Sequence, residues 1–167
     1  MSILTQKTLS NKISFEGIGV HTGCKVKMDI LPASPNTGII FKRIDLKNNN
    51  IVIPNYNNVC DATLCTTIVN EYGVKVSTVE HLLGAFYGIG IDNAIVEIDS
   101  QEVPILDGSA KYFIEAIKNT KLKYSDTPIK IIKVEEKVEV KHQNKIISIE
   151  KSNVNLDIDF EIKYDNQ

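Results

Sequence analysis

The chain has 167 residues, a net charge of −2 and a pI near 5.9, which excludes the strongly basic surface typical of nucleic-acid-binding proteins. Hydrophobic residues make up 43% of the chain and charged residues 24%, enough apolar material for a globular core. No run approaches about 18 consecutive apolar residues, which excludes a membrane-spanning helix.

The cysteines and the N-terminus indicate the cellular compartment in which the protein is found. Cys24, Cys60 and Cys65 are an odd number of cysteines without CxxC spacing, which argues for free thiols in a reducing environment. The N-terminus is polar within a few residues and lacks the apolar segment of a secretion signal. We therefore expect a cytoplasmic protein.

Taken in chain order, the residues before Ser77 predict β structure. Residues 25–31 alternate polar and apolar side chains, which is typical of a half-buried strand. The glycine-rich loop at 17–23 is not a phosphate-binding fingerprint, because no helix follows it. The other strands predicted in this part of the chain are 13–16, 39–41, 51–53, 64–69 and 74–76.

A strand-to-helix junction follows at Ser77. We expect Ser77 to be the N-cap of a helix that ends at Gly88 or Gly90, and Glu80 has the spacing of its capping-box partner. Glu80 lies beside His81, and a metal hydrolase needs such a pair: an imidazole ligand, and a carboxylate base that accepts the proton of a water molecule. The alternative is that Glu80 only caps the helix and His81 is a half-buried histidine with ordinary hydrogen bonds.

A second strand and helix complete the first block. Residues 94–98 predict a strand, and the apolar side chains from Ala110 to Ile117 have helical spacing up to Asn119. Two helices with roughly six strands predict an α+β fold. We expect residues 1–120 to form a two-layer domain in which two helices cover a mainly antiparallel sheet.

The sequence predicts a break after this domain. Residues 121–127 are charged, end at a Thr-Pro step and predict a linker. Strands are predicted beyond it at 129–134, 138–140, 146–149 and 156–162. Because no helix follows to cover them, we expect residues 128–167 to be the opening strands of a second, incomplete β-rich domain of the same type.

Six motifs occur in a familiar order, at residues 17–23, 36–39, 64–66, 77–82, 90–93 and 104–110. With them the chain resembles the N-terminal half of the bacterial UDP-3-O-acyl-N-acetylglucosamine deacetylases, the zinc amidases that commit lipid A synthesis. The resemblance runs from near Thr8 to the last residue. It implies two similar domains with the active site at their junction, and hydrolysis of the N-acetyl group of UDP-3-O-(3-hydroxyacyl)-N-acetylglucosamine with release of acetate.

The resemblance also implies roles for individual residues. Glu80 matches the general base of the family, and His81 matches its first Zn²⁺ ligand. The positions that match substrate-binding residues are Leu64 and Cys65 beside the metal, Lys145 near the nucleotide diphosphate, and Tyr164 near an aromatic residue that stacks on uracil.

The implied zinc site is incomplete in this sequence. Catalytic zinc takes three protein ligands, and the family supplies two of them from a His-x-x-x-Asp pair in its second domain. The other histidines, His21 and His142, are followed at the fourth position by Lys25 and Ile146. We therefore expect the chain to hold about half of an active site and to be inactive alone.

Four candidate residues keep two interpretations each. His21 either contacts the site directly or only packs its loop or hydrogen-bonds to substrate. Asp107 either caps the second helix or contacts catalytic groups of the second domain. Cys65 either lines the pocket or is a small core residue, and Lys145 either contacts phosphate or lies in a solvated hairpin turn.

Two functions from different classes remain. The first is the zinc amidase, acting on a small UDP-sugar substrate with no nucleic acid and no membrane span. The alternative is a non-catalytic α+β binding or assembly module that retains the deacetylase fold.

Overall fold

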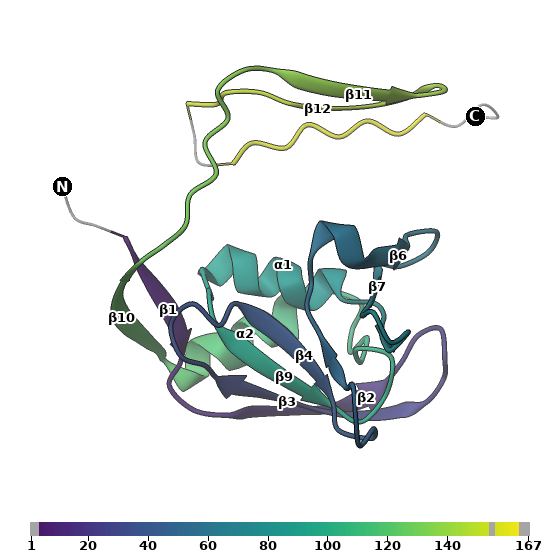
Figure 1. Ribbon diagram of the computed structural model, residues 1–167, viewed down its shortest axis with the longest axis vertical. Coiled ribbons are helices and arrows are strands. Elements are labelled where there is room, and N and C mark those ends of the chain that lie inside the picture. The colour runs from purple at the N-terminus through teal and green to yellow at the C-terminus, as the bar shows by residue number, and fades with distance from the viewer. Residues whose placement is uncertain (1–3, 154–155, 164–167) are drawn as a thin grey trace. The chain divides into compact units, whose positions relative to one another are not determined.

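A computed structural model describes residues 4–153 and 156–163, and the chain divides into two compact units, Met1–Ile129 and Lys130–Gln167 (Figure 1). The second unit contains the strands β11 (Val138–His142) and β12 (Lys145–Ile149). The elements of the first unit are β1 (Thr5–Leu9), β2 (Ile13–Ile18), β3 (Lys25–Pro32), β4 (Ile39–Arg43), β5 (Ile51–Val52), the 3₁₀ turn η1 (Tyr56–Asn58), β6 (Val59–Asp61), β7 (Thr67–Val69), β8 (Lys75–Val76), α1 (Glu80–Ile89), β9 (Ala94–Ile98), α2 (Lys111–Thr120) and β10 (Leu122–Pro128).

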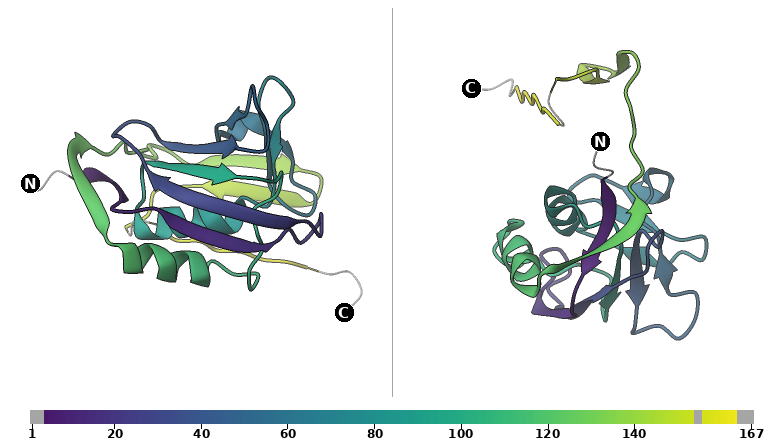
Figure 2. Two further views of the ribbon diagram at one scale, coloured as in Figure 1. Left: turned by 90° about the horizontal axis from the view of Figure 1, so that it is seen from below. Right: turned by 90° about the vertical axis from the view of Figure 1, so that its left-hand side faces the viewer.

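The first unit is built on a five-stranded sheet with the order β2-β3-β9-β4-β5. All neighbours in this sheet are antiparallel except β4 and β9, which are parallel. The helices α1 and α2 cover one face of the sheet (Figures 1 and 2). The expectation of an α+β fold with two helices and mainly antiparallel strands is confirmed.

The alternating pattern of β3 explains why one face of the sheet is covered. Val26, Met28 and Ile30 are fully buried, whereas Lys25 and Lys27 on the opposite face are exposed. Burying one such apolar side chain stabilises the fold by about 1.5–3 kcal/mol, which favours this register over a one-residue slip.

The helices contribute their apolar faces to the same core. Leu82 and Phe86 of α1 and Phe113 of α2 are buried, and the ring of Phe113 meets that of Phe15 edge to face at 5.1 Å. Helix α1 ends at Gly90, which has a left-handed φ of 79° and donates its N–H to the carbonyl of Phe86. The predicted glycine C-cap is therefore confirmed at Gly90.

The expected linker at 121–127 is a strand. β10 pairs antiparallel with β1, and the side-chain amide of Gln6 donates to the carbonyl of Pro128 at 2.9 Å. The pairing was not visible in the sequence, because β10 exposes most of its side chains. Its partner β1, which we did not predict, is also more than a hundred residues earlier in the chain.

The second unit is an antiparallel hairpin in its described part. Val138 pairs with Ile149 and His142 with Lys145, as expected for strands at 138–140 and 146–149. The strands expected at 129–134 and 156–162 are not formed. The N–H of Ile129 donates to the carbonyl of Leu4 at 3.0 Å, but neither segment forms a ladder with another strand among the described residues. Five apolar side chains of the hairpin are more than half exposed: Val138, Val140, Ile146, Ile147 and Ile149.

Neither helix approaches the length of a membrane span. α1 and α2 have ten residues each, and no helix in the described ranges is long and apolar enough to cross a bilayer.

Candidate active site

The chain turns from β8 into α1 through a left-handed residue. Ser77 forms a parallel bridge with Glu102 and donates both its N–H and its hydroxyl to the carbonyl of Gln101, at 2.8 and 3.2 Å. Thr78 then adopts a φ of 58°, and α1 begins at Glu80 without a side-chain cap. The predicted capping box is wrong, because the bridge already engages Ser77 and the helix starts three residues after it.

The Glu80 carboxylate is held from outside the helix. Its Oε2 accepts the backbone N–H of Thr66 at 3.0 Å, and Glu80 is half-buried. The carbonyl of Thr66 accepts the N–H of Val79 at 3.5 Å, so the Thr66 backbone contacts the first turn of α1 twice. The carboxylate is therefore oriented by a neighbouring loop while its other oxygen, Oε1, has no hydrogen bond among the described residues.

His81 follows on the next position of α1 and is half-buried. In the described part of the chain its imidazole makes no hydrogen bond, ion pair or ring contact. Successive helical residues point about 100° apart, so Glu80 and His81 reach adjacent sides of the helix start. The structure thus brings these two predicted residues together at one end of α1.

The loop between β6 and β7 carries two further predicted residues. The strand expected at 64–69 begins only at Thr67, and Leu64 and Cys65 precede it in the loop. Leu64 is 82% exposed, so it has no place in the core of the first unit. Cys65 is half-buried with its Sγ 3.7 Å from Thr67 Oγ1. Because Thr66 contacts Glu80, both residues lie in the segment next to the start of α1.

Glu102 is a buried carboxylate that connects the junction to the glycine-rich turn. Its side chain is fully buried. Oε1 accepts the N–H of His21 and the hydroxyl of Thr78, both at 3.0 Å. Oε2 accepts the N–H of Thr22 at 2.8 Å and its hydroxyl at 2.7 Å. Burial alone would raise the pKa of Glu102, but these hydrogen bonds outweigh it and lower the pKa below its ordinary value.

The turn at 19–24 fits around this carboxylate. A Cβ on Gly19 would collide with Glu102 Oε2 and Thr22 Oγ1, so only glycine allows the backbone to approach so closely. His21 uses its backbone N–H for Glu102 and has an exposed side chain. The structure therefore fixes the backbone of His21 beside the junction and leaves both interpretations of its imidazole open.

Asp107 is exposed and organises the turn before α2. Its Oδ1 accepts the N–H and the hydroxyl of Ser109 at 3.0 and 2.9 Å, and the Ser109 hydroxyl accepts the N–H of Lys111 at 3.1 Å. Partial desolvation would raise the pKa of Asp107, but the hydrogen bonds from Ser109 lower it overall. Asp107 therefore does not cap α2 itself: the N-cap is Ala110, without a side-chain cap, and Asp107 holds Ser109, whose hydroxyl accepts the first N–H of the helix.

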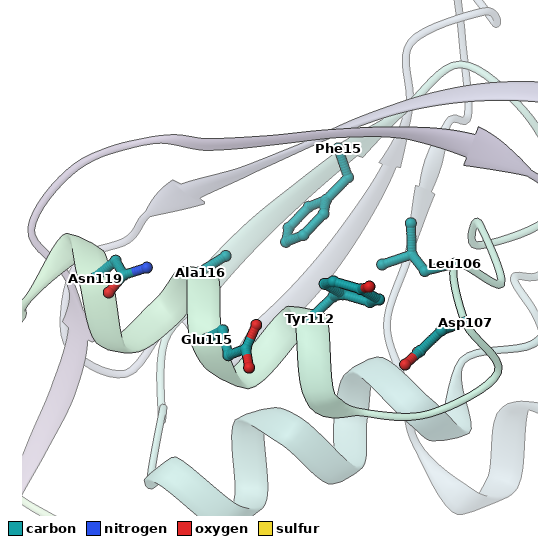
Figure 3. Close-up of a pocket in the computed structure, with 7 residues that line it drawn as sticks. All are labelled: Phe15, Leu106, Asp107, Tyr112, Glu115, Ala116 and Asn119. Carbon is teal, nitrogen blue, oxygen red and sulfur yellow. The ribbon is translucent and has the colours of Figure 1, made fainter.

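A groove lies between β2 and α2 with Asp107 at its rim (Figure 3). Glu80, His81, Leu64 and Cys65 do not line it. Its lining residues are Phe15, Leu106, Asp107, Tyr112, Glu115, Ala116 and Asn119.

The other two predicted substrate residues, Lys145 and Tyr164, do not belong to the first unit. Lys145 is the exposed first residue of β12 in the second unit. Tyr164 lies outside the described residues.

The described part of the chain does not complete a metal site. No group of three or more His, Cys, Asp or Glu side chains that could hold a metal is found among the described residues. His81 by itself offers one nitrogen, whereas catalytic zinc takes three protein ligands. The donors among the described residues therefore supply one of the three protein ligands of a catalytic zinc site.

Three residues at the site were missed by sequence reasoning. Thr66 and Glu102 contact residues more than ten positions away. Thr66 lies in the motif at 64–66, but nothing in that motif shows that its amide reaches Glu80, and Glu102 lies in none of the six motifs. Thr78 lies in the motif at 77–82, but nothing in the sequence shows that this β-branched residue adopts a left-handed conformation.

The family model described as "LpxC: UDP-3-O-acyl N-acetylglycosamine deacetylase" matches residues 6–167. The chain belongs to the LpxC family. This family is zinc-dependent and acts in lipid A biosynthesis.

The relatives share this name across several bacteria. The UDP-3-O-acyl-N-acetylglucosamine deacetylase of Teredinibacter turnerae is 46% identical over 143 residues, covering 86% of this chain and 47% of the relative. Those of Colwellia psychrerythraea and Haemophilus influenzae strain PittEE are each 40% identical, covering 95% and 98% of this chain and 53% of each relative. The chain spans about half the length of the curated LpxC proteins it matches.

Proposed function

We propose that this chain is part of a zinc-dependent deacetylase that hydrolyses the N-acetyl group of UDP-3-O-(3-hydroxyacyl)-N-acetylglucosamine and releases acetate. The observation that carries the proposal is the pair Glu80 and His81 at the start of α1 in a chain of the LpxC family, with the Glu80 carboxylate oriented by the N–H of Thr66. A cytoplasmic location is part of the proposal and rests on the three free cysteines.

In this proposal His81 supplies one ligand and residues outside this chain supply the others. Zinc, when bound, would lower the pKa of water and polarise the N-acetyl carbonyl. Glu80 accepts the proton of the attacking water on its free oxygen Oε1, while Oε2 stays on the Thr66 amide. Water adds to the amide carbonyl as Glu80 takes its proton. The C–N bond then breaks, the leaving amine takes that proton from Glu80, and acetate is released.

The remaining predicted residues are assigned to substrate. Leu64 and Cys65 would line the pocket beside Glu80, which fits the high exposure of Leu64 in this unit. Lys145 would approach the diphosphate, and Tyr164 the uracil ring. His21 and Asp107 would contribute contacts around the site. We propose further that residues 128–167 open a second domain, which fits the exposed apolar side chains of the β11–β12 hairpin.

The alternative is a non-catalytic binding or assembly module with the deacetylase fold. One observation favours it for the chain alone: His81 has no companion ligands among the described residues.

Acetate release by the full-length protein that contains this chain tests the proposal. We expect turnover of the UDP-3-O-acyl-N-acetylglucosamine that a metal chelator abolishes and Zn²⁺ restores. An inactive zinc-loaded protein that still binds the substrate would support the binding module instead.

A further inference from the structure

We propose that Glu102 is a positioning residue for the deacetylation, because its carboxylate holds the left-handed turn at Thr78 and so sets the place of Glu80 and His81 at the start of α1. The inference rests on the proposed function. Glu102 acts through Thr78 and the backbone, without touching substrate.

The chemistry of Glu102 is unusual for a residue that only fills the core. A buried carboxylate is costly unless hydrogen bonds or a cation compensate it, and an apolar side chain of similar size would often serve stability better. Glu102 is fully buried, and none of the ion pairs among the described residues includes it. Four hydrogen bonds satisfy its two oxygens instead.

Those hydrogen bonds act at a strained point of the backbone. A β-branched residue with a positive φ is an outlier, and such a conformation persists only where the surroundings impose it. The Thr78 hydroxyl donates to Glu102 Oε1, and the backbone of Ser77 pairs on both sides of Glu102, with the carbonyl of Gln101 and the N–H of Val103. Glu102 therefore holds the turn through its side chain and through its neighbours.

The turn sets the direction of α1. Thr78 stands two residues before Glu80 and three before His81. Released from its left-handed conformation, Thr78 would redirect the chain that enters the helix, so Glu80 and His81 would move together. A displacement of about 1 Å at reacting groups can cost about 10²-fold in rate.

The carboxylate also needs its charge. All four groups that face Glu102 are donors, from His21, Thr22 and Thr78. A glutamine has the same shape, but whichever way its amide turns, the NH₂ group would face a backbone N–H, that of His21 or that of Thr22, and an N–H cannot accept a hydrogen bond. Glu102→Gln therefore breaks the network with little change of volume.

A rescue experiment separates positioning from plain stability. In the full-length deacetylase we expect Glu102→Gln to lower kcat by about 10- to 100-fold, with KM within about threefold and zinc retained. Adding Thr78→Gly should recover most of the lost kcat, because glycine adopts the left-handed turn without the cost of a Cβ. The matched control is Asp99→Asn, since Asp99 also accepts a backbone N–H, from Lys27 at 2.7 Å, but has no hydrogen bond to the junction. Its kcat should stay within about twofold.

Two results would overturn the inference. One is a Glu102→Gln protein with normal kcat at temperatures where it is folded, and the other is a loss of kcat that Thr78→Gly does not relieve. If Glu102→Gln fails to fold, Thr78→Val carries the test, because it replaces the hydroxyl that donates to Glu102 with a methyl group and should lower kcat while KM is kept.

A wild-type protein without deacetylase activity would refute the proposed function and leave the geometry to be tested separately. In that case amide hydrogen exchange on the 167-residue chain decides. Glu102→Gln should speed exchange at His21, which donates to Glu102, and at Leu83, which donates to the carbonyl of Val79 in the first turn of α1. Unchanged exchange at Leu83 would overturn the positioning role.

Discussion

Two substitutions of Glu80 separate its structural contact from its proposed chemistry. Alanine removes both the acceptor for the Thr66 N–H and the proton-accepting carboxylate. Glutamine keeps a carbonyl oxygen that can accept the N–H at the same place, but it cannot accept a proton from water. We therefore expect the two variants to differ in stability and to agree in their loss of rate.

The size of the stability change follows from the contact. A hydrogen bond to a charged group contributes about 1.5–3 kcal/mol, and the half-buried position of Glu80 lets water replace part of it, so Glu80→Ala should cost about 1–2 kcal/mol. For a chain of this size that lowers Tm by about 3–8 °C. Glu80→Gln should stay within about 2 °C of the wild type, while both variants lose at least about 10²-fold in kcat in the full-length protein.

Thermal melting of the 167-residue chain and acetate release by the full-length protein give the two numbers. Glu115→Ala is the matched control, because this glutamate is exposed on α2 and should change stability by less than about 0.5 kcal/mol. A less stable Glu80→Ala enzyme that keeps its activity would refute the general-base role. An unchanged Tm would refute the contact with Thr66.

Three further predictions follow from the same geometry. Because the pKa of Glu102 is lowered, the contribution of its carboxylate to the stability of the fold is present above pH 4.5 and is lost as the pH falls through the folded pKa. The Tm difference between wild type and Glu102→Gln should therefore narrow toward about pH 3, and a constant difference would contradict this. Amide exchange should be faster in β11 and β12 than in β3, because the hairpin is exposed; equal protection would mean that the hairpin has a partner. The 167-residue chain should bind Zn²⁺ more weakly than about 1 μM by calorimetry, and a tighter site abolished by His81→Ala would refute the half-site.

The elements with a strong local pattern were predictable from the sequence. Residues 25–31 alternate, and the structure places β3 there with Val26, Met28 and Ile30 buried. The conformational freedom of glycine predicted a C-cap at Gly88 or Gly90, and the structure has it at Gly90. Periodicity and helix ends are local properties, so a single sequence carries them.

Elements that depend on a distant partner were not predictable. β1 and β10 pair although they stand at opposite ends of the sequence of the first unit, and the charged composition of 121–127 suggested a linker. The segment 156–162 shows the opposite error, since it was predicted as a strand but finds no pairing partner among the described residues. A strand needs a neighbour, and a single sequence does not name it.

The residues of the candidate site also fall into those that a local sequence pattern predicts and those that depend on distant contacts. The adjacent pair Glu80 and His81 was visible in the sequence, and the structure places both at the start of α1. The contacts around them, from the Thr66 amide to Glu80 and from the Thr78 hydroxyl to Glu102, join distant parts of the chain and could not be predicted from the local sequence. The capping box failed because Ser77 pairs with residues beside Glu102 instead of capping α1.

The zinc content of two purified full-length variants tests the central claim most directly. If Glu80 is the base and His81 a ligand, Glu80→Ala should retain zinc near one equivalent per chain, while His81→Ala should lose it, because two remaining ligands hold the metal poorly. A His81→Ala protein that keeps its full complement of zinc would contradict the proposed site.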